Sequence, residues 1–348
     1  MQRSGTSRAP IQGPRVGLVL GGGGILGGAW LIGALHALQE ATGFDPVNAS
    51  HIVGTSAGSV IGSLVGEGIS PWFLVYHQRG GDVSAMTDRF HEPIRNAEEE
   101  SRSFISWTGT VPRPVLGSPS LALRTTIQPW RYPAMTALTG WIGRGFLSTE
   151  AIGRVVRSLV PSGWSSHPNL WLVSLDYTSG RRVVFGRNGA PRAHLDEAVQ
   201  ASCAIPGLYR PMRIGGKLYV DGGVWSPSNL DLLSHDDVEL DLVIALNPMS
   251  SLQPGLPTTL VERVERHVRT ASGRRFGREA RRLREKGTQI LMVQPEEEDL
   301  RAMGINLMDP SRRVSVLETA IATTARRLRQ ADALAVIRDL RRPDSAAG

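Results

Sequence analysis

Short apolar runs that end in glycine alternate with helical patterns near the start of this 348-residue chain. Arg15–Leu20 leads directly into Gly21–Gly24, and a helical pattern follows as far as about Glu40. His51–Thr55 is a second such run, and Ala57–Val65 again has helical spacing. Runs of this kind are typical of buried parallel strands. Their alternation with helices predicts an α/β fold in three layers, α/β/α, around a mainly parallel central sheet.

Further strand and helix signals extend this pattern. Apolar runs predict two hairpins, Asn169–Asp176 with Arg181–Phe185 and Met212–Ile214 with Leu218–Val220, and two single strands, Leu242–Leu246 and Gln289–Val293. Helices are predicted from Ser70-Pro71 onward and over Ser148–Val160, Leu195–Ala204, Leu260–Lys286 and Arg312–Leu340. We expect one domain over residues 14–342, with a disordered tail at 1–13 and a short tail at 343–348.

Residues 80–147 interrupt the regular pattern because they are rich in proline and tryptophan and show no clear periodicity. We expect an irregular insertion that lies over the core and could act as a lid. Tryptophan favours the boundary between membrane and water, so such a lid would suit a lipid surface. A packed structural insertion is the alternative.

The charged residues bear on partners more than on fold. The net charge is +7, and all basic residues except Lys217 and Lys286 are arginines, which bind phosphate and carboxylate groups bidentately. Many of them lie in a predicted basic helix at 256–287, which could contact an anionic membrane. We favour a solvated helix face there because glutamates are interspersed. A general preference for arginine codons is the simpler explanation of the surplus, and no motif supports nucleic-acid binding.

No apolar run reaches the roughly 18–20 residues that a transmembrane helix needs. The arginines before Val16–Leu20 resemble the start of a signal peptide, but Gly21–Gly24 follows too soon. The single cysteine, Cys203, allows no internal disulfide and suits a reducing compartment. We expect a cytoplasmic protein that could contact the membrane peripherally. The sequence leaves its oligomeric state open.

The glycine-rich turn at Gly22–Gly27 matches G-x-G-x-x-G. Backbone N–H groups in such a loop, beside a helix N-terminus, can bind a pyrophosphate or a developing oxyanion. A tight turn that only helps packing is the third alternative. A dinucleotide site needs an acidic residue at the end of the next strand. Asp45 has about the right spacing but lies in a turn before that strand, so we predict no cofactor, and no metal site either.

Gly54-Thr55-Ser56-Ala57-Gly58 matches G-x-S-x-G between a predicted strand and a predicted helix. In a nucleophile elbow the turn is so sharp that side chains at the two glycine positions would collide. A simple turn with a capping serine has the same residues. The strand before the motif and the helix after it favour Ser56 as a nucleophile.

A serine nucleophile needs a base, which is usually histidine. None of the eight histidines lies in a motif. Asp221 is the better candidate because it follows the apolar run Leu218–Val220 and precedes Gly222 and Gly223, which leave room beside the carboxylate. Strand ends are where functional residues gather in open α/β sheets. An ordinary Asp-Gly turn is the alternative.

Together these motifs resemble the patatin-like phospholipase family. That family has a glycine-rich oxyanion loop, then G-x-S-x-G, then D-G-G or D-G-A. The same order appears here in Gly22–Gly27, Gly54–Gly58 and Asp221–Gly223. The segment Ala198–Asp221, AVQASCAIPGLYRPMRIGGKLYVD, is similar to the family's A-S-x-A-x-P-x-x-F-x-P run before the aspartate. The resemblance covers about residues 15–295.

The resemblance implies a serine acyl hydrolase that cleaves fatty acyl esters of lipids through a Ser–Asp dyad. Ser56 would attack the ester carbonyl and Asp221 would accept its proton, so we expect burial to raise the pKa of Asp221. The expected oxyanion donors are the N–H groups of Gly22, Gly23 and Gly24. The glycines expected to shape the three turns are Gly27, Gly54, Gly58, Gly222 and Gly223. Leu26 departs from the family pattern, which often has arginine or lysine there.

Two alternatives stay open. One is a conventional α/β-hydrolase with a Ser–Asp–His triad, although Ser56 follows only the second predicted strand. The other is a catalytically silent lipid-binding or docking protein of the same fold. The presence of both Ser56 and Asp221 favours an enzyme over the silent protein.

Overall fold

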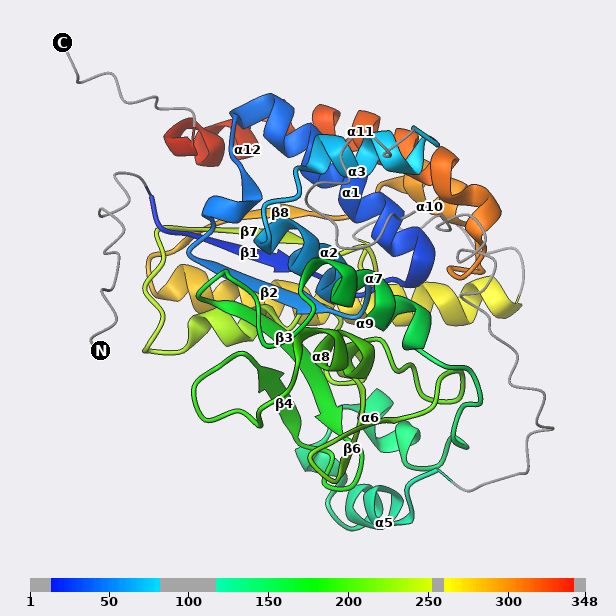
Figure 1. Ribbon diagram of the computed structural model, residues 1–348. Helices are drawn as coiled ribbons and strands as arrows, with labels where there is room; N and C mark the ends of the chain where they lie inside the picture. The colour runs from blue at the N-terminus through cyan, green and yellow to red at the C-terminus, as the bar shows by residue number, and fades with distance from the viewer. Residues whose placement is uncertain (1–13, 82–116, 252–259, 341–348) are drawn as a thin grey trace, which may run out of the picture.

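The computed structural model describes residues 14–81, 117–251 and 260–340 (Figure 1). The predicted tails at 1–13 and 343–348 and the first half of the predicted insertion lie outside these ranges. Within them, a sheet of eight strands carries helices on both faces. The α/β/α fold with a mainly parallel central sheet is therefore confirmed. That residues 14–342 form a single domain stays a prediction.

Parallel strands form the centre of the described sheet. In the spatial order β3-β2-β1-β7-β8 they are Leu170–Asp176, His51–Thr55, Val16–Leu20, Leu242–Leu246 and Gln289–Val293. Most of their side chains are buried, as expected for strands covered on both faces. Three further strands, linked by antiparallel pairing, lie at the β3 end of the sheet: β4 (Arg182–Phe185), β5 (Met212–Ile214) and β6 (Lys217–Asp221). Both predicted hairpins form: β3 pairs with β4, and β5 pairs with β6 at the edge of the sheet.

Alternate side chains of each strand face two different helical layers. Leu18 and Ile52 belong to the larger core, whose helices include α1 (Gly24–Thr42), α2 (Ala57–Gly66) and α11 (Arg313–Leu328). Val19 and Val53 point the other way, toward α9 (Leu260–Glu285) and the 3-10 helix η5 (Leu230–Ser234). The other described α-helices are α3 (Pro71–Gln78), α5 (Pro119–Ile127), α6 (Ala134–Thr139), α7 (Glu150–Leu159), α8 (Leu195–Ser202), α10 (Glu297–Met303) and α12 (Ala331–Ile337).

The C-terminal helix is predicted as one element over Arg312–Leu340, and this is wrong. It is divided into α11 and α12 because the backbone at Gln330 is extended, with φ −70° and ψ 146°. The helices predicted from the sequence also do not include α10. The helix predicted to begin at Ser148 begins at Glu150, with Thr149 as its N-cap. The Ser148 hydroxyl accepts a hydrogen bond from the Glu150 N–H at 3.1 Å.

The described part of the insertion is more regular than predicted. Residues 117–147 contain α5, α6 and, between them, the 3-10 helix η3 (Pro129–Arg131). Ser118 caps α5 by accepting a hydrogen bond from the Leu121 N–H, and Pro119 occupies the first turn. This half of the insertion therefore contains short helices that the sequence did not predict. Across the three described ranges, no helix is both long enough and apolar enough to cross a membrane.

Candidate active site

Two strands that run toward each other meet at the same edge of β3. Ser174 of β3 pairs with β4 on one edge and with Asp221 of β6 on the other. Val173 likewise pairs with β4 on one edge and with Thr55 of β2 on the other. Because β2 is parallel and β6 antiparallel to β3, their carboxyl ends face each other at neighbouring register positions. This arrangement brings Ser56, the residue after Thr55, beside Asp221.

Ser56 has the backbone conformation of a sharp elbow. Its φ of 52° and ψ of −121° are unusual for a residue with a side chain. A Cβ at Gly54 would lie 2.6 Å from the Gly58 carbonyl oxygen, and a Cβ at Gly58 would lie 2.0 Å from the Leu20 carbonyl oxygen. Both positions therefore require glycine. Ser56 occupies the N-cap of α2, but its side chain makes no capping hydrogen bond, which argues against the capping-serine alternative.

Asp221 is a buried carboxyl group, 5% exposed, that ends β6. Burial raises its pKa to about 6, while hydrogen bonds from the Ser56 side chain and from the Gly223 N–H partly oppose the rise. The Gly223 N–H donates to Oδ1 at 2.7 Å. A Cβ at Gly222 would lie 2.4 Å from the Val173 carbonyl oxygen, so this turn also needs glycine. The arrangement can hold a carboxylate ready to accept a proton from Ser56 near neutral pH.

The end of α8 and the residues just after it position both strand ends. The Ser202 hydroxyl accepts a hydrogen bond from the Ser56 N–H at 2.9 Å and donates to the Val173 carbonyl at 2.7 Å. The Ala204 carbonyl accepts a hydrogen bond from the Asp221 N–H at 3.0 Å. In the sequence, Ser202 and Ala204 stand out only as part of a family pattern. Their contacts give that pattern a physical role, because one short segment fixes the backbone of both Ser56 and Asp221.

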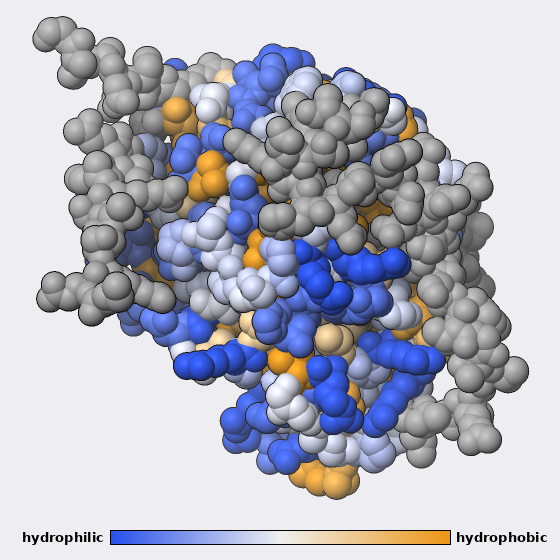
Figure 2. All heavy atoms as spheres, in the orientation of Figure 1, coloured by the Kyte–Doolittle hydropathy of each residue, from blue (hydrophilic) through white to orange (hydrophobic). Residues whose placement is uncertain are grey.

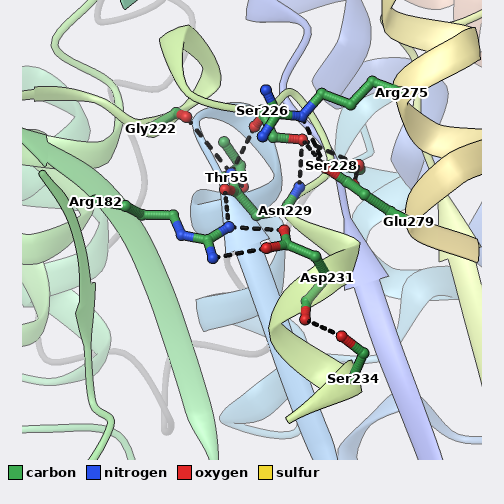
Figure 3. Close-up of polar contacts among 10 residues, drawn as sticks. All are labelled: Thr55, Arg182, Gly222, Ser226, Ser228, Asn229, Asp231, Ser234, Arg275 and Glu279. Carbon is green, nitrogen blue, oxygen red and sulfur yellow. Dashed lines mark hydrogen bonds and ion pairs between the residues drawn. The ribbon is translucent and has the colours of Figure 1, made fainter. Parts of the chain in front are cut away.

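A buried polar network lies behind the two strand ends, and no sequence motif marks it (Figure 3). Its centre is Asn229, which is fully buried and has a φ of 50°. The Asn229 amide group donates to the Thr55 hydroxyl at 3.0 Å, to the Ser226 carbonyl at 2.6 Å and to the Gly222 carbonyl at 3.5 Å. Asn229 therefore links the residue before Ser56 to the residue after Asp221.

Ion pairs anchor this network to the sheet and to α9 (Figure 3). Arg182 of β4 donates to the Asn229 side-chain oxygen at 3.1 Å and forms a bidentate pair with Asp231, each contact 2.7 Å long. Glu279 of α9 accepts hydrogen bonds from the hydroxyls of Ser226 and Ser228. Glu279 is buried and pairs with Arg275 at 2.9 Å. These partners satisfy a polar cluster that would otherwise be costly to bury.

The glycine loop lies against Ser56, but one of its three predicted donors is engaged. A Cβ at Gly22 would lie 3.2 Å from the Ser56 Cβ, which shows how closely the loop approaches. The Gly22 N–H donates to the Pro227 carbonyl at 2.9 Å, so the expectation that Gly22 is an oxyanion donor is corrected for this conformation. Gly23 caps α1 and Gly24 begins it. Their N–H groups lie at the positive end of that helix, which favours negative charge.

Two further positions of the loop have structural roles. The Gly27 N–H donates to the Gly23 carbonyl at 2.9 Å, and a Cβ at Gly27 would lie 3.3 Å from Pro248. Leu26, which stands where the resembled family often has a cation, is fully buried in the larger core. A charged side chain at this position would lose its hydration. The chain therefore uses this position for packing.

Three of the described histidines, His51, His167 and His194, make their contacts away from Ser56 and Asp221. The His167 ring hydrogen-bonds to the Ala49 carbonyl at 2.8 Å, and the His194 ring accepts from the Gly163 N–H. His51 contacts Trp171 edge-to-face at 5.0 Å. His91 lies outside the described residues. Within residues 14–81, 117–251 and 260–340, no group of three or more His, Cys, Asp or Glu side chains is arranged to hold a metal ion.

An apolar cavity of about 240 Å³ lies next to Ser56. It follows α2 along one face, where residues from Ala57 to Leu64 contribute to the wall. The other walls come mainly from α1, α3 and α7, and Cys203 and Tyr209 line it as well. Burial raises the pKa of the Cys203 thiol, so this cysteine is an unreactive part of the wall.

Comparisons with known proteins confirm the family resemblance seen in the sequence. A family model described as patatin-like phospholipase matches residues 18–234. An uncharacterized NTE family protein of Mycobacterium tuberculosis is 29% identical over 263 residues, which cover 74% of this chain and 57% of that relative. A Mycobacterium bovis protein matches with the same figures. The chain thus spans little more than half the length of these curated relatives.

Solved structures also show similarity at low sequence identity. VipD from Legionella pneumophila matches with a TM-score of 0.44 and 16% identity, over 92% of this chain and 69% of VipD. ExoU, described as a type III effector protein, matches with a TM-score of 0.36 and 16% identity, over 92% of this chain and 53% of ExoU.

Proposed function

This chain belongs to the patatin-like phospholipase family, and on that premise we propose that it is a serine acyl hydrolase that cleaves fatty acyl esters of lipids. Ser56 is the proposed nucleophile and Asp221 the proposed base. The observation that carries the proposal is the hydrogen bond between the Ser56 side chain and a buried carboxyl group whose pKa is raised to about 6. A carboxylate with this pKa can accept a proton near neutral pH.

The proposed reaction has two halves. Asp221 accepts the Ser56 proton while Oγ attacks the ester carbonyl, and it then gives this proton to the departing alcohol. The negative oxygen of the tetrahedral intermediate lies near the N–H groups of Gly23 and Gly24, whose place at the start of α1 favours negative charge. In the second half, Asp221 takes a proton from water as the water oxygen attacks the acyl-enzyme. The bond between the acyl carbon and Ser56 Oγ then breaks, Asp221 returns the proton to Oγ, and the fatty acid leaves.

The apolar cavity supports an acyl substrate. Its wall along α2 is made of side chains at helical spacing, from Ala57 to Leu64. With a rise of about 1.5 Å per residue, this wall extends roughly 10 Å from the serine. An alkyl chain placed there would leave water and contact apolar side chains over its length, which is favourable at about 0.8 kcal/mol per buried methylene group.

A serine-directed fluorophosphonate probe tests the nucleophile. We expect labelling of the wild-type protein and no labelling of Ser56→Ala. Ser63→Ala is the matched control, because Ser63 is also a buried serine but lies about two turns into α2, where its hydroxyl donates to the Ser59 carbonyl. This control should be labelled like the wild type. Labelling that persists in Ser56→Ala would refute the assignment.

A substrate panel then tests the reaction. Phospholipid, lysophospholipid and triacylglycerol are offered to the wild type, Ser56→Ala and Asp221→Asn, and the released fatty acid is measured. Both variants should lose hydrolysis of every lipid that the wild type cleaves. A folded wild-type protein that is neither labelled nor active would instead support the silent lipid-binding alternative. Full activity in Asp221→Asn would point to a different base.

A further inference from the structure

The second half of the insertion exposes an unusual number of large apolar side chains. We call this set the α5–α6 surface, and its members are Leu123, Ile127, Trp130, Met135, Leu138 and Trp141. Each is at least 47% exposed, and Trp130 reaches 78%. They account for more than half of the exposed large hydrophobic residues in the described part of the chain, although they span only 19 positions. Figure 2 shows hydrophobic side chains at the lower end of the molecule, where Figure 1 places α5.

These side chains belong to a packed unit. Helix α5 buries Leu121, Ala122 and Thr125 on its inner side and leaves Leu123 and Ile127 outside. The Ser118 N–H donates to the Gly140 carbonyl at 3.0 Å, which ties the start of α5 to the end of α6. A Cβ at Gly140 would lie 2.5 Å from the Ala122 nitrogen, so the two segments are in close contact. The apolar side chains are thus held outward by a defined scaffold.

All charged side chains of this unit are positive. From Gly117 to Thr149 the chain has no aspartate or glutamate, and its charged residues are Arg124, Arg131 and Arg144, all exposed. Arginine beside exposed tryptophan and aliphatic side chains matches the boundary of an anionic bilayer, where tryptophan inserts and arginine meets phosphate. The same positive charge opposes pairing with a second copy through this face, because like charges would then be placed together.

The unit is attached directly to the candidate site. The Thr136 hydroxyl of α6 donates to the Val224 carbonyl at 2.8 Å, three residues beyond Asp221. A Cβ at Gly145 would lie 2.4 Å from the Tyr209 nitrogen, and Tyr209 contributes to the apolar cavity. A lipid surface that contacts α5 and α6 would therefore lie close to the proposed dyad.

We propose that the α5–α6 surface docks this protein onto an anionic lipid bilayer. The proposal rests on the proposed lipid substrate, which explains why docking and catalysis would be neighbours. It also differs from the less favoured alternative of the sequence analysis, in which the basic helix contacts the membrane. Helix α9 turns Phe276, Ala280 and Leu283 into the core. Among its side chains from residue 266 onward, the exposed ones are mainly arginines, and Val268 is the one large apolar side chain among them.

The test measures vesicle binding with Ser56→Ala protein, so that no lipid is consumed. Vesicles are made either of phosphatidylcholine alone or of an equimolar mixture with phosphatidylglycerol, and the bound fraction is measured by co-sedimentation. The combined substitution Leu123→Ser, Ile127→Ser and Trp130→Ser should weaken binding to the mixed vesicles by at least about tenfold. Trp72→Ser is the matched control, since Trp72 is also half exposed but lies on α3. It should bind like the parent protein.

Charge variants separate the two candidate surfaces. Arg124→Gln, Arg131→Gln and Arg144→Gln together should weaken binding to mixed vesicles and leave the weaker binding to phosphatidylcholine unchanged. Arg274→Gln, Arg278→Gln and Arg281→Gln on α9 form the control, because these arginines are exposed as well. Loss of binding in the α9 control alone, or unchanged binding in the variants of the α5–α6 unit, would overturn the proposal.

Two more readouts distinguish membrane docking from self-association and from misfolding. If sedimentation velocity shows a dimer that the Leu123, Ile127 and Trp130 substitutions dissociate, a second copy covers the surface and the proposal fails. In a protein that retains Ser56, these substitutions should leave fluorophosphonate labelling unchanged, which also shows that the chain is folded. If the protein binds vesicles but the probe does not label the wild type, the docking proposal would stand and the proposed hydrolase function would be refuted.

Discussion

At the scale of single residues, the candidate site depends on an acid that is removed from water. The Asp221 carboxyl is buried, and its pKa is raised to about 6 although Ser56 and Gly223 both stabilise the charged form. Desolvation therefore dominates the electrostatics of the site. The raised pKa was expected from the mechanism that the family resemblance implies, because a base that works near neutral pH needs a pKa well above the usual aspartate value.

The pKa of Asp221 sets the acid limit of activity. Below about pH 6 the carboxyl is protonated and cannot accept the Ser56 proton, so kcat/KM for a soluble short-chain ester should rise with pH through about pH 6. Above that limit the profile should be flat until another group titrates. Activity that stays constant down to about pH 4 would contradict Asp221 as the base.

The same burial predicts a pH-dependent gain in stability for Asp221→Asn. The folded-state pKa of Asp221 lies above the unfolded value of 3.8, so the folded protein binds the proton more tightly and becomes less stable as pH rises from about 4 to 6. The asparagine variant lacks this loss. Its unfolding free energy should exceed that of the wild type by at most about 3 kcal/mol at about pH 8, and the difference should shrink toward pH 4. Denaturant unfolding at both pH values measures it, and an equal difference at both would count against a raised pKa.

At the scale of elements, turns and braces decide where Ser56 and Asp221 lie. The elbow and the turn after β6 were predictable, since each combines an apolar strand with glycines. Asn229 was not, because its role depends on partners from β2 and β4 that are distant in the sequence. The helix α5 did leave a signal: Ser118-Pro119 starts it just as Ser70-Pro71 starts α3. The break between α11 and α12 could not be predicted, because no glycine or proline lies there in the sequence.

Asn229 should act as a positioning residue. Replacing it by glycine keeps a residue that tolerates the φ of 50° but removes every side-chain hydrogen bond to Thr55, Gly222 and Arg182. Small shifts of a nucleophile are costly, so kcat should fall about tenfold to a hundredfold while KM changes little. Ser234→Ala is the control, because the Ser234 hydroxyl donates to the Asp231 carbonyl at the margin of the network. A fall in kcat of equal size in both variants would exclude the positioning role.

Gly58 of the elbow and Gly28 of α1, which lines the apolar cavity, should differ sharply in their tolerance of a side chain. Gly58→Ala would place a Cβ 2.0 Å from the Leu20 carbonyl oxygen, so the elbow cannot close and fluorophosphonate labelling should be lost. Gly28→Ala would meet nothing nearer than the Ala57 Cβ at 3.9 Å, and labelling should persist. The labelled fraction of soluble protein measures both. Normal labelling of Gly58→Ala would show that this elbow geometry is not needed.

At the scale of the whole molecule, the helices on one face of the sheet enclose the cavity that we assign to the acyl chain. Leu64 lies on the cavity wall two turns of α2 beyond Ser56. Leu64→Trp should fill the far part of the cavity, so kcat/KM for long-chain esters should fall by at least about tenfold while short-chain esters react normally. The measurement is a series of p-nitrophenyl esters of increasing chain length. A parallel loss for all lengths would mean that the cavity does not hold the acyl chain.

The meeting of β2 and β6 on one edge of β3 has a consequence for how the protein comes into being. The chain that carries Ser56 is synthesised long before the chain that carries Asp221, and β3, which aligns them, lies between the two in sequence. In a nascent chain, Ser56 therefore lacks its proposed base until residues beyond 221 have left the ribosome and β6 has joined the sheet. On the proposed mechanism, a chain whose translation stops before Asp221 would lack the base and could not cleave esters.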